Sequence, residues 1–112
     1  MYQLTCVVQI APAFVGICGS DLHEYLGGPT FAPTEPHPVT GEFVPIGFGH
    51  EFSGVVTDIG KDVDKSLGLK KGDNVAVQPT VCCWKCGPCK EGALNCCDTA
   101  GFLGLSGRYL SD

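Results

Sequence analysis

Short apolar runs broken by glycine and proline recur along the chain, and this pattern indicates a turn-rich β protein. Runs rich in Val and Ile at 52–59 and 74–78 favour strands. The charged stretch 60–72 is expected to join these strands across the surface, and Gly72-Asp73 is a turn signal. Residues 42–46 are expected to be extended.

The first third of the chain combines one strand signal with one helix signal. A β-leaning run covers residues 4–10 and can continue to Val15 past a proline. A short helix is expected to start at Ser20 or Asp21 as its cap and to run through Tyr25 and Leu26. The proline-rich stretch 27–41 has little periodicity and is expected to be a loop.

Composition narrows the class further. A chain of 112 residues with 16 Gly and 8 Pro is long enough for one small domain and argues against a helical bundle. A net charge of −5, with seven Lys and Arg, provides no basic face for nucleic acid. No run approaches the roughly 18 apolar residues of a membrane span, and no export signal is recognisable. The chain is therefore expected in the cytoplasm, where thiols stay reduced.

Six of the eight cysteines fall between Cys82 and Cys97 and suggest a metal site. Separations of three, three and eight residues suit four thiolates around a tetrahedral zinc ion, with glycine and proline supplying the turns. Two disulfides, buried thiols or a redox Cys-x-x-Cys pair are the alternatives, although the setting of a redox motif is missing. Spacing alone leaves open whether Cys82 or Cys83, and Cys96 or Cys97, supplies a ligand.

A second candidate site combines a thiolate, an imidazole and a carboxylate from Cys18, His50 and Glu51. Catalytic zinc uses such mixed shells and keeps one position open. The hydroxyl of Ser20 is placed to contact a metal-bound alkoxide, and the imidazole of His23 is placed to pass a proton to solvent. Taken singly, Cys18 also fits a buried thiol, His23 a surface residue and Glu51 a paired charge; their conjunction favours the metal site.

Four motifs of the chain together resemble those of a known family. The carrying motifs are Gly16-Ile-Cys-Gly-Ser-Asp-Leu-His, Gly49-His-Glu, Lys71-Gly-Asp-Asn-Val and the Cys83, Cys86, Cys89 and Cys97 spacing. They resemble the zinc-dependent medium-chain alcohol dehydrogenases. Within that family, Glu24-Tyr-Leu-Gly-Gly-Pro and Gly101-Phe-Leu-Gly-Leu-Ser-Gly look most similar to butanediol dehydrogenases, with sorbitol and other polyol dehydrogenases next.

The resemblance implies a mainly β fold: one GroES-like β-barrel domain over 1–112, with a short helix and an inserted four-cysteine zinc lobe at 82–97. It also implies roles for individual residues. Structural zinc is expected at Cys83, Cys86, Cys89 and Cys97. Catalytic zinc is expected at Cys18, His50 and Glu51, and proton-relay roles fall to Ser20 and His23.

The chain also departs from the family pattern. Strands before Val8, a further zinc ligand downstream and the Gly-x-Gly-x-x-Gly nucleotide motif are missing, and the segment 108–112 lacks the glycines of relatives. We therefore expect a fragment truncated at both ends, with no Rossmann domain, no NAD(P) binding and no activity alone. The family reaction is oxidation of a secondary alcohol, such as a small diol, to a ketone.

Several alternatives stay open at the level of sequence. The chain could be a non-catalytic zinc module that acts through a protein partner, or a disulfide-stapled extracellular domain. The exact alcohol, NAD versus NADP, and assembly into a homo-oligomer are also undecided by sequence.

Overall fold

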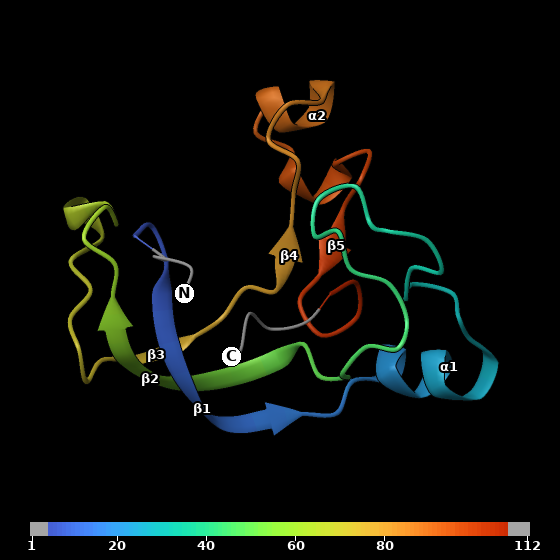
Figure 1. Ribbon diagram of the computed structural model, residues 1–112, viewed down its shortest axis with the longest axis horizontal. Coiled ribbons are helices and arrows are strands. Elements are labelled where there is room, and N and C mark those ends of the chain that lie inside the picture. Colours follow the sequence, from blue (N-terminus) through green and yellow to red (C-terminus); the bar gives the residue numbers. More distant parts are fainter. Residues whose placement is uncertain (1–4, 108–112) are drawn as a thin grey trace. The chain divides into compact units, whose positions relative to one another are not determined.

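The computed structural model describes residues 5–107 and divides into two compact units, which are described one at a time (Figure 1). The first unit comprises Met1–Val15 and Phe52–Val77, and the second comprises Gly16–Glu51 and Gln78–Asp112. The start of the expected strand 4–10 and the atypical segment 108–112 lie outside the described residues.

A three-stranded sheet with the order β1-β2-β3 forms most of the first unit. Its strands are β1 (Val8–Gly16), β2 (Glu51–Ile59) and β3 (Asn74–Ala76). The antiparallel β2–β3 pair sets Gly54 opposite Val75. The strand expected at 52–59 is confirmed, whereas β3 is shorter than the expected run 74–78.

The expected continuation of the first strand past Pro12 is confirmed, because β1 runs from Val8 to Gly16, whereas the described residues 5–7 are not part of the strand. Proline has no backbone N–H to donate, but Pro12 is tolerated in β1 because one side of an edge strand has no neighbouring strand to bond to. At Gly54, a Cβ would lie 2.3 Å from the carbonyl oxygen of Ala11, so glycine is what allows β2 to approach β1 closely. Val56 on β2, at 1% exposure, is the most deeply buried side chain of this unit.

The connection 60–72 between β2 and β3 contains one turn of 3-10 helix, η1 (Lys65–Leu67). The Asp64 side chain caps this turn by accepting a hydrogen bond of 2.8 Å from the backbone N–H of Ser66. Gly72 closes the connection with a φ of 93°, in the left-handed region that glycine adopts without strain. The predicted surface connection and its closing turn are therefore confirmed.

The second unit holds a helix, a small sheet and the cysteine-rich lobe. Helix α1 (Gly19–Gly27) is followed by a long irregular segment, and β4 (Thr80–Val81) pairs antiparallel with β5 (Gly101–Phe102). Figure 1 shows α2 (Gly87–Lys90) beyond one end of the β4–β5 pair. A 3-10 turn, η2 (Leu94–Cys96), follows α2.

The chain beyond β5 packs back onto the irregular segment that follows α1. The Thr40 hydroxyl donates a hydrogen bond of 2.6 Å to the carbonyl of Ser106, whose side chain is buried. A Cβ on Gly101 would lie 2.9 Å from the ring of His37, so the two segments are in close contact there. These contacts hold the long irregular segment in place although it has no strand partner among the described residues.

Two local expectations are wrong. The helix cap is Cys18 instead of Ser20 or Asp21, because the Asp21 carboxylate already lies inside the first turn and accepts the backbone N–H of Cys18. Residues 42–46 are not extended throughout, because the chain bends at Val44 and Pro45, and Val44 donates its backbone N–H to Pro33 within the same loop.

The mainly β class with short helices is confirmed. None of the helices in residues 5–107 has the length and apolar character needed to cross a bilayer.

Candidate metal centres

Four thiols converge in the lobe of the second unit. The sulfurs of Cys83, Cys86, Cys89 and Cys97 all lie within 4.8 Å of one another. Zinc–sulfur bonds of about 2.3 Å at tetrahedral angles put neighbouring sulfurs about 3.8 Å apart. The Cys83 and Cys97 sulfurs are 3.6 Å apart, which fits a metal between them and is far longer than the roughly 2.05 Å of a disulfide. All eight cysteines are free thiols.

The neighbouring cysteines stand outside this group. The buried Cys82 thiol donates a hydrogen bond of 3.3 Å to the carbonyl of Leu94, and Cys96 is exposed. Burial also raises the pKa of Cys82, which keeps this thiol protonated. The fold therefore gathers the sulfurs of Cys83 and Cys97 with those of Cys86 and Cys89, whereas Cys82 and Cys96 are not in this group.

Backbone N–H groups prepare part of this cluster for ionisation. The N–H groups of Lys85 and Cys86 lower the pKa of Cys83 to about 6, and the N–H of Cys83, 3.4 Å from the Cys97 sulfur, lowers the pKa of Cys97. Burial raises the pKa of Cys89 to about 12. A divalent cation held by these four residues would favour their thiolate forms, including that of Cys89, because its positive charge would offset the repulsion among neighbouring thiolates.

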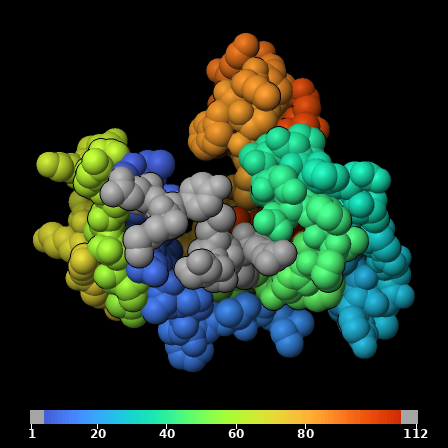
Figure 2. Space-filling model, viewed as in Figure 1, coloured from blue at the N-terminus to red at the C-terminus, as the bar shows by residue number. Residues whose placement is uncertain are grey.

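Tight turns wrap the chain around the four sulfurs. Cys86 is the N-cap of α2, and Pro88 stands in the first turn of that helix, where its missing N–H costs nothing. Trp84 adopts a φ of 59°, which is unusual for a bulky side chain, and its ring is 70% exposed. Figure 2 shows the lobe, in orange, as one cluster of atoms at the surface.

The mixed set Cys18, His50 and Glu51 also converges, with one ligand atom from each side chain within 4.8 Å of the others. Cys18 is the N-cap of α1, and Glu51 is the first residue of β2. Gly49 has a φ of 117° immediately before His50, a backbone conformation that glycine adopts far more easily than other residues. The imidazole of His50 is buried, at 8% exposure, whereas the Glu51 side chain is exposed.

Asp21 contacts both Cys18 and His50, and it was not among the site residues predicted from the sequence. One carboxylate oxygen accepts the Cys18 backbone N–H at 2.9 Å, and the other lies 3.2 Å from Nδ1 of His50. These two atoms are close but make no hydrogen bond in the described geometry. The carboxylate lies on the Nδ1 side of the ring, where a carboxylate behind a metal-binding histidine is usually found. The sequence signal that could have identified Asp21 is an acidic residue three positions after a candidate cysteine ligand, at the start of a helix. Its burial, at 8% exposure, is seen only in the fold.

The two predicted relay residues have different environments. The Ser20 hydroxyl lies 3.2 Å from Nε2 of His50, so it borders the candidate metal position. His23 is exposed on α1, three residues later and therefore on the same side of the helix. Ser20 therefore lies beside the candidate ligands, and His23 is exposed to solvent on the same side of α1.

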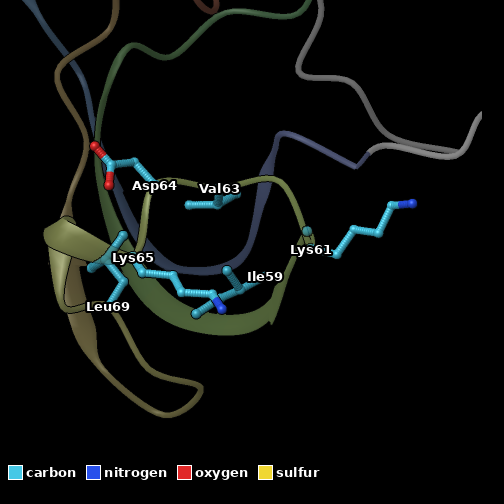
Figure 3. Close-up of a pocket in the computed structure, with 7 residues that line it drawn as sticks. Ile59, Lys61, Val63, Asp64, Lys65 and Leu69 are labelled. Atoms are coloured by element: carbon cyan, nitrogen blue, oxygen red, sulfur yellow. The ribbon is translucent and has the colours of Figure 1, made fainter.

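A cavity in the first unit contains none of these candidate residues. It has a volume of about 230 Å³ and is lined by Ile59, Gly60, Lys61, Val63, Asp64, Lys65 and Leu69. Figure 3 shows Lys61 directed away from the other labelled side chains. Both candidate metal-ligand sets consist of residues of the second unit.

Comparisons with known proteins agree with this geometry. The chain is 48% identical over 101 residues to (R,R)-butanediol dehydrogenase of Bacillus subtilis, and the match covers 89% of this chain and 27% of that protein. It is 45% identical over 93 residues to the probable D-xylulose reductase A of Arthroderma otae, which covers 80% of this chain and 22% of that protein. The chain thus spans about a quarter of the length of these relatives.

Solved structures show the same likeness. The crystal structure of 2R,3R-butanediol dehydrogenase from Bacillus subtilis superposes with a TM-score of 0.77 at 48% identity, over 89% of this chain and 27% of that one. D-arabinose dehydrogenase from Sulfolobus solfataricus gives 0.63 at 30% identity, over 90% of this chain and 27% of that one. Residues 6–111 match the alcohol dehydrogenase GroES-like domain, and the chain therefore belongs to that family.

Proposed function

We propose that this chain is the metal-binding catalytic part of a zinc-dependent dehydrogenase that oxidises a small secondary alcohol or diol to a ketone. The proposal treats residues 1–112 as one domain with a zinc lobe at 82–97. The observation that carries it is the convergence of Cys18, His50 and Glu51 beside the Ser20 hydroxyl. Relatives named butanediol dehydrogenase and xylulose reductase support the substrate class.

The two ligand sets are proposed to hold one zinc ion each. The four-cysteine set gives a closed shell of thiolates, which is typical of structural zinc. The mixed set has three candidate ligands, so a position remains for the alcohol oxygen. When bound there, zinc supplies Lewis-acid polarisation of that oxygen.

The protein groups around this position are suited to removing the alcohol proton. Ser20, next to Nε2 of His50, is placed to accept a hydrogen bond from the alcohol and to pass its proton outward. His23, exposed on the same side of α1, is proposed as the next acceptor toward solvent. Hydride transfer also requires a nicotinamide cofactor, which we assign to the part of the enzyme that these relatives have beyond the matched quarter.

The free thiols fit a reducing compartment, so a cytoplasmic location is part of the proposal. Assembly into homo-oligomers remains a prediction.

Elemental analysis of the purified chain tests the metal content. A zinc content near two per chain supports both sites. A content near one supports the cysteine lobe alone and refutes the alcohol-binding function, and a content near zero refutes both sites. Cys18→Ser and Cys83→Ser should each lower the zinc content by about one ion by removing a ligand from different sets. Cys6→Ser is the matched control, because Cys6 is exposed and outside both sets.

Cobalt substitution tests the alcohol site. The d–d absorption of cobalt reports on its ligands, so 2,3-butanediol should change the spectrum of the cobalt-loaded chain. Cys18→Ser should abolish this change, and Cys83→Ser should keep it. A spectrum insensitive to the diol at every concentration would contradict an alcohol-binding role.

A further inference from the structure

Helix α1 buries acidic side chains and exposes apolar ones, the opposite of the usual pattern. Its buried residues are the acidic Asp21 and Glu24, at 8% and 5% exposure. Its apolar residues Leu22, Tyr25 and Leu26 are 53%, 77% and 73% exposed. A helix of nine residues is marginal by itself, and hydrophobic packing of its apolar side is not what holds this one in the described structure. Its polar side must therefore position it.

Glu24 provides the strongest of these polar attachments. Its carboxylate accepts the backbone N–H groups of Thr30, Phe31 and Ala32 at 2.8–2.9 Å, together with the Thr30 hydroxyl. Burial raises the pKa of Glu24, but these hydrogen bonds outweigh it and hold the pKa at about 2. The side chain is thus a buried carboxylate, ionised at neutral pH and surrounded by donors from one short segment.

The same segment closes tightly against the end of the helix. A Cβ on Gly28 would lie 2.3 Å from the Glu24 carbonyl oxygen and 2.9 Å from its carboxyl carbon. The Gly28 backbone N–H also donates to that carbonyl at 2.9 Å. The last turn of α1 and segment 28–32 are therefore in close contact and joined by several hydrogen bonds.

The first turn of α1 is attached by the other buried carboxylate. Asp21 accepts the N–H of Cys18 and lies 3.2 Å from His50, one helical turn before Glu24. The two carboxylates thus fix opposite ends of one helix on its inner side. Because the helix is short and stiff, a tilt at its last turn would move Cys18 and Ser20 relative to His50.

We propose that Glu24 is a positioning residue for the Cys18, His50 and Glu51 metal site, acting by holding the last turn of α1 against residues 30–32. The inference rests on the proposed function, because it assumes that this set binds a metal. Glu24 itself is not among the candidate ligands. It acts through the orientation of the helix that carries Cys18 and Ser20.

The test measures cobalt affinity at the mixed site of the full chain by competition with a chelator, with the four-cysteine site as the internal reference. Glu24→Gln removes the charge and turns an amide N–H₂ toward backbone N–H groups. Affinity at the mixed site is expected to fall by about tenfold, the lower end of losses seen when groups behind metal ligands are changed. Affinity at the four-cysteine site should not change.

Two controls separate positioning from general destabilisation. Glu35→Gln removes an exposed carboxylate from the same connecting segment and should leave both affinities unchanged. Val56→Ala creates a cavity in the first unit and should lower Tm without weakening the mixed site. If Glu24→Gln does not fold, Thr30→Val replaces it; this variant removes one of four donors and should weaken the mixed site about twofold to threefold.

A second readout does not depend on metal. In the metal-free chain, Glu24→Gln should shift the NMR resonances of the His50 ring, because Ser20 and Asp21 move relative to it, and Glu35→Gln should not. Unchanged His50 resonances together with unchanged mixed-site affinity would overturn the inference. A wild-type chain that binds only one metal would refute the proposed function instead, and the His50 resonances would still decide whether Glu24 positions α1.

Discussion

Replacing Asp21 by Asn tests the architecture of the mixed site most directly. The carboxylate has two acceptor oxygens, one for the backbone N–H of Cys18 at 2.9 Å and one 3.2 Å from Nδ1 of His50. An amide has one acceptor oxygen and one N–H₂ group. If its oxygen accepts from Cys18, its N–H₂ faces the imidazole nitrogen that should carry a proton when Nε2 binds a metal. If the amide is flipped, its N–H₂ faces the N–H of Cys18.

The size of the effect follows from this conflict. In the flipped orientation the amide loses the 2.9 Å hydrogen bond from Cys18 and leaves a buried donor unsatisfied, which costs about 1–3 kcal/mol. In the other orientation it removes the negative charge 3.2 Å from Nδ1 of His50, a close contact without a hydrogen bond. Changing a group behind a metal ligand typically weakens metal binding 10–100-fold, or about 1.4–2.7 kcal/mol. The two routes agree, so Asp21→Asn should weaken metal binding at Cys18, His50 and Glu51 by one to two orders of magnitude.

The assay is a chelator competition with cobalt or zinc on the full chain, in which the four-cysteine site serves as reference. Asp62→Asn, which changes an exposed carboxyl group in the first unit, should leave both affinities unchanged. Equal loss at both metal sites would indicate general unfolding. An unchanged affinity at the mixed site in a folded Asp21→Asn protein would refute the reasoning, because the carboxylate would then not be supporting His50.

Three further predictions concern the lobe and the helix. Cys97→Ser should lower the zinc content of the lobe and destabilise the fold, because a complete structural zinc site contributes on the order of 10 kcal/mol of apparent binding energy and one of its ligands is lost. Cys82→Ser should leave the zinc content unchanged. Elemental analysis measures both, and zinc loss only in Cys82→Ser would contradict the ligand assignment. Trp84→Gly should raise the free energy of unfolding by about 1 kcal/mol, because glycine adopts the left-handed φ of 59° without strain and the Trp84 ring is mostly exposed. Thermal unfolding measures this change. The control Lys85→Gly should lower the free energy of unfolding. The pKa of Glu24, about 2 against an ordinary 4.5, means that this carboxylate stabilises the fold above pH 4.5 and that its contribution is lost as the pH falls toward 2; Glu24→Gln should therefore show a smaller acid-induced drop in Tm, and equal drops would contradict it.

Elements and chemistry that depend on local pattern could be predicted from the amino-acid sequence. Runs of β-branched residues specify a strand wherever their neighbours allow one, and β2 follows its predicted run almost residue for residue. Cysteines spaced by two intervening residues can reach one metal whatever the rest of the fold does, so the lobe was predictable from spacing. The residue types alone suggested that Cys18 and His50 could share a metal site, and the family resemblance supported the same pairing although the two motifs are far apart in the sequence.

Features that depend on groups far apart in the chain could be seen only in the folded protein. Spacing could not separate Cys83 from Cys82, because both are within reach of a metal; the backbone turns one sulfur into the cluster and the other toward Leu94. Residues 42–46 look extended by composition but are not extended throughout, because a backbone hydrogen bond of this stretch is made within its own loop. The buried roles of Asp21 and Glu24 were hidden for the same reason, since a carboxylate in a helix is expected to face solvent until the fold supplies donors that compensate its burial.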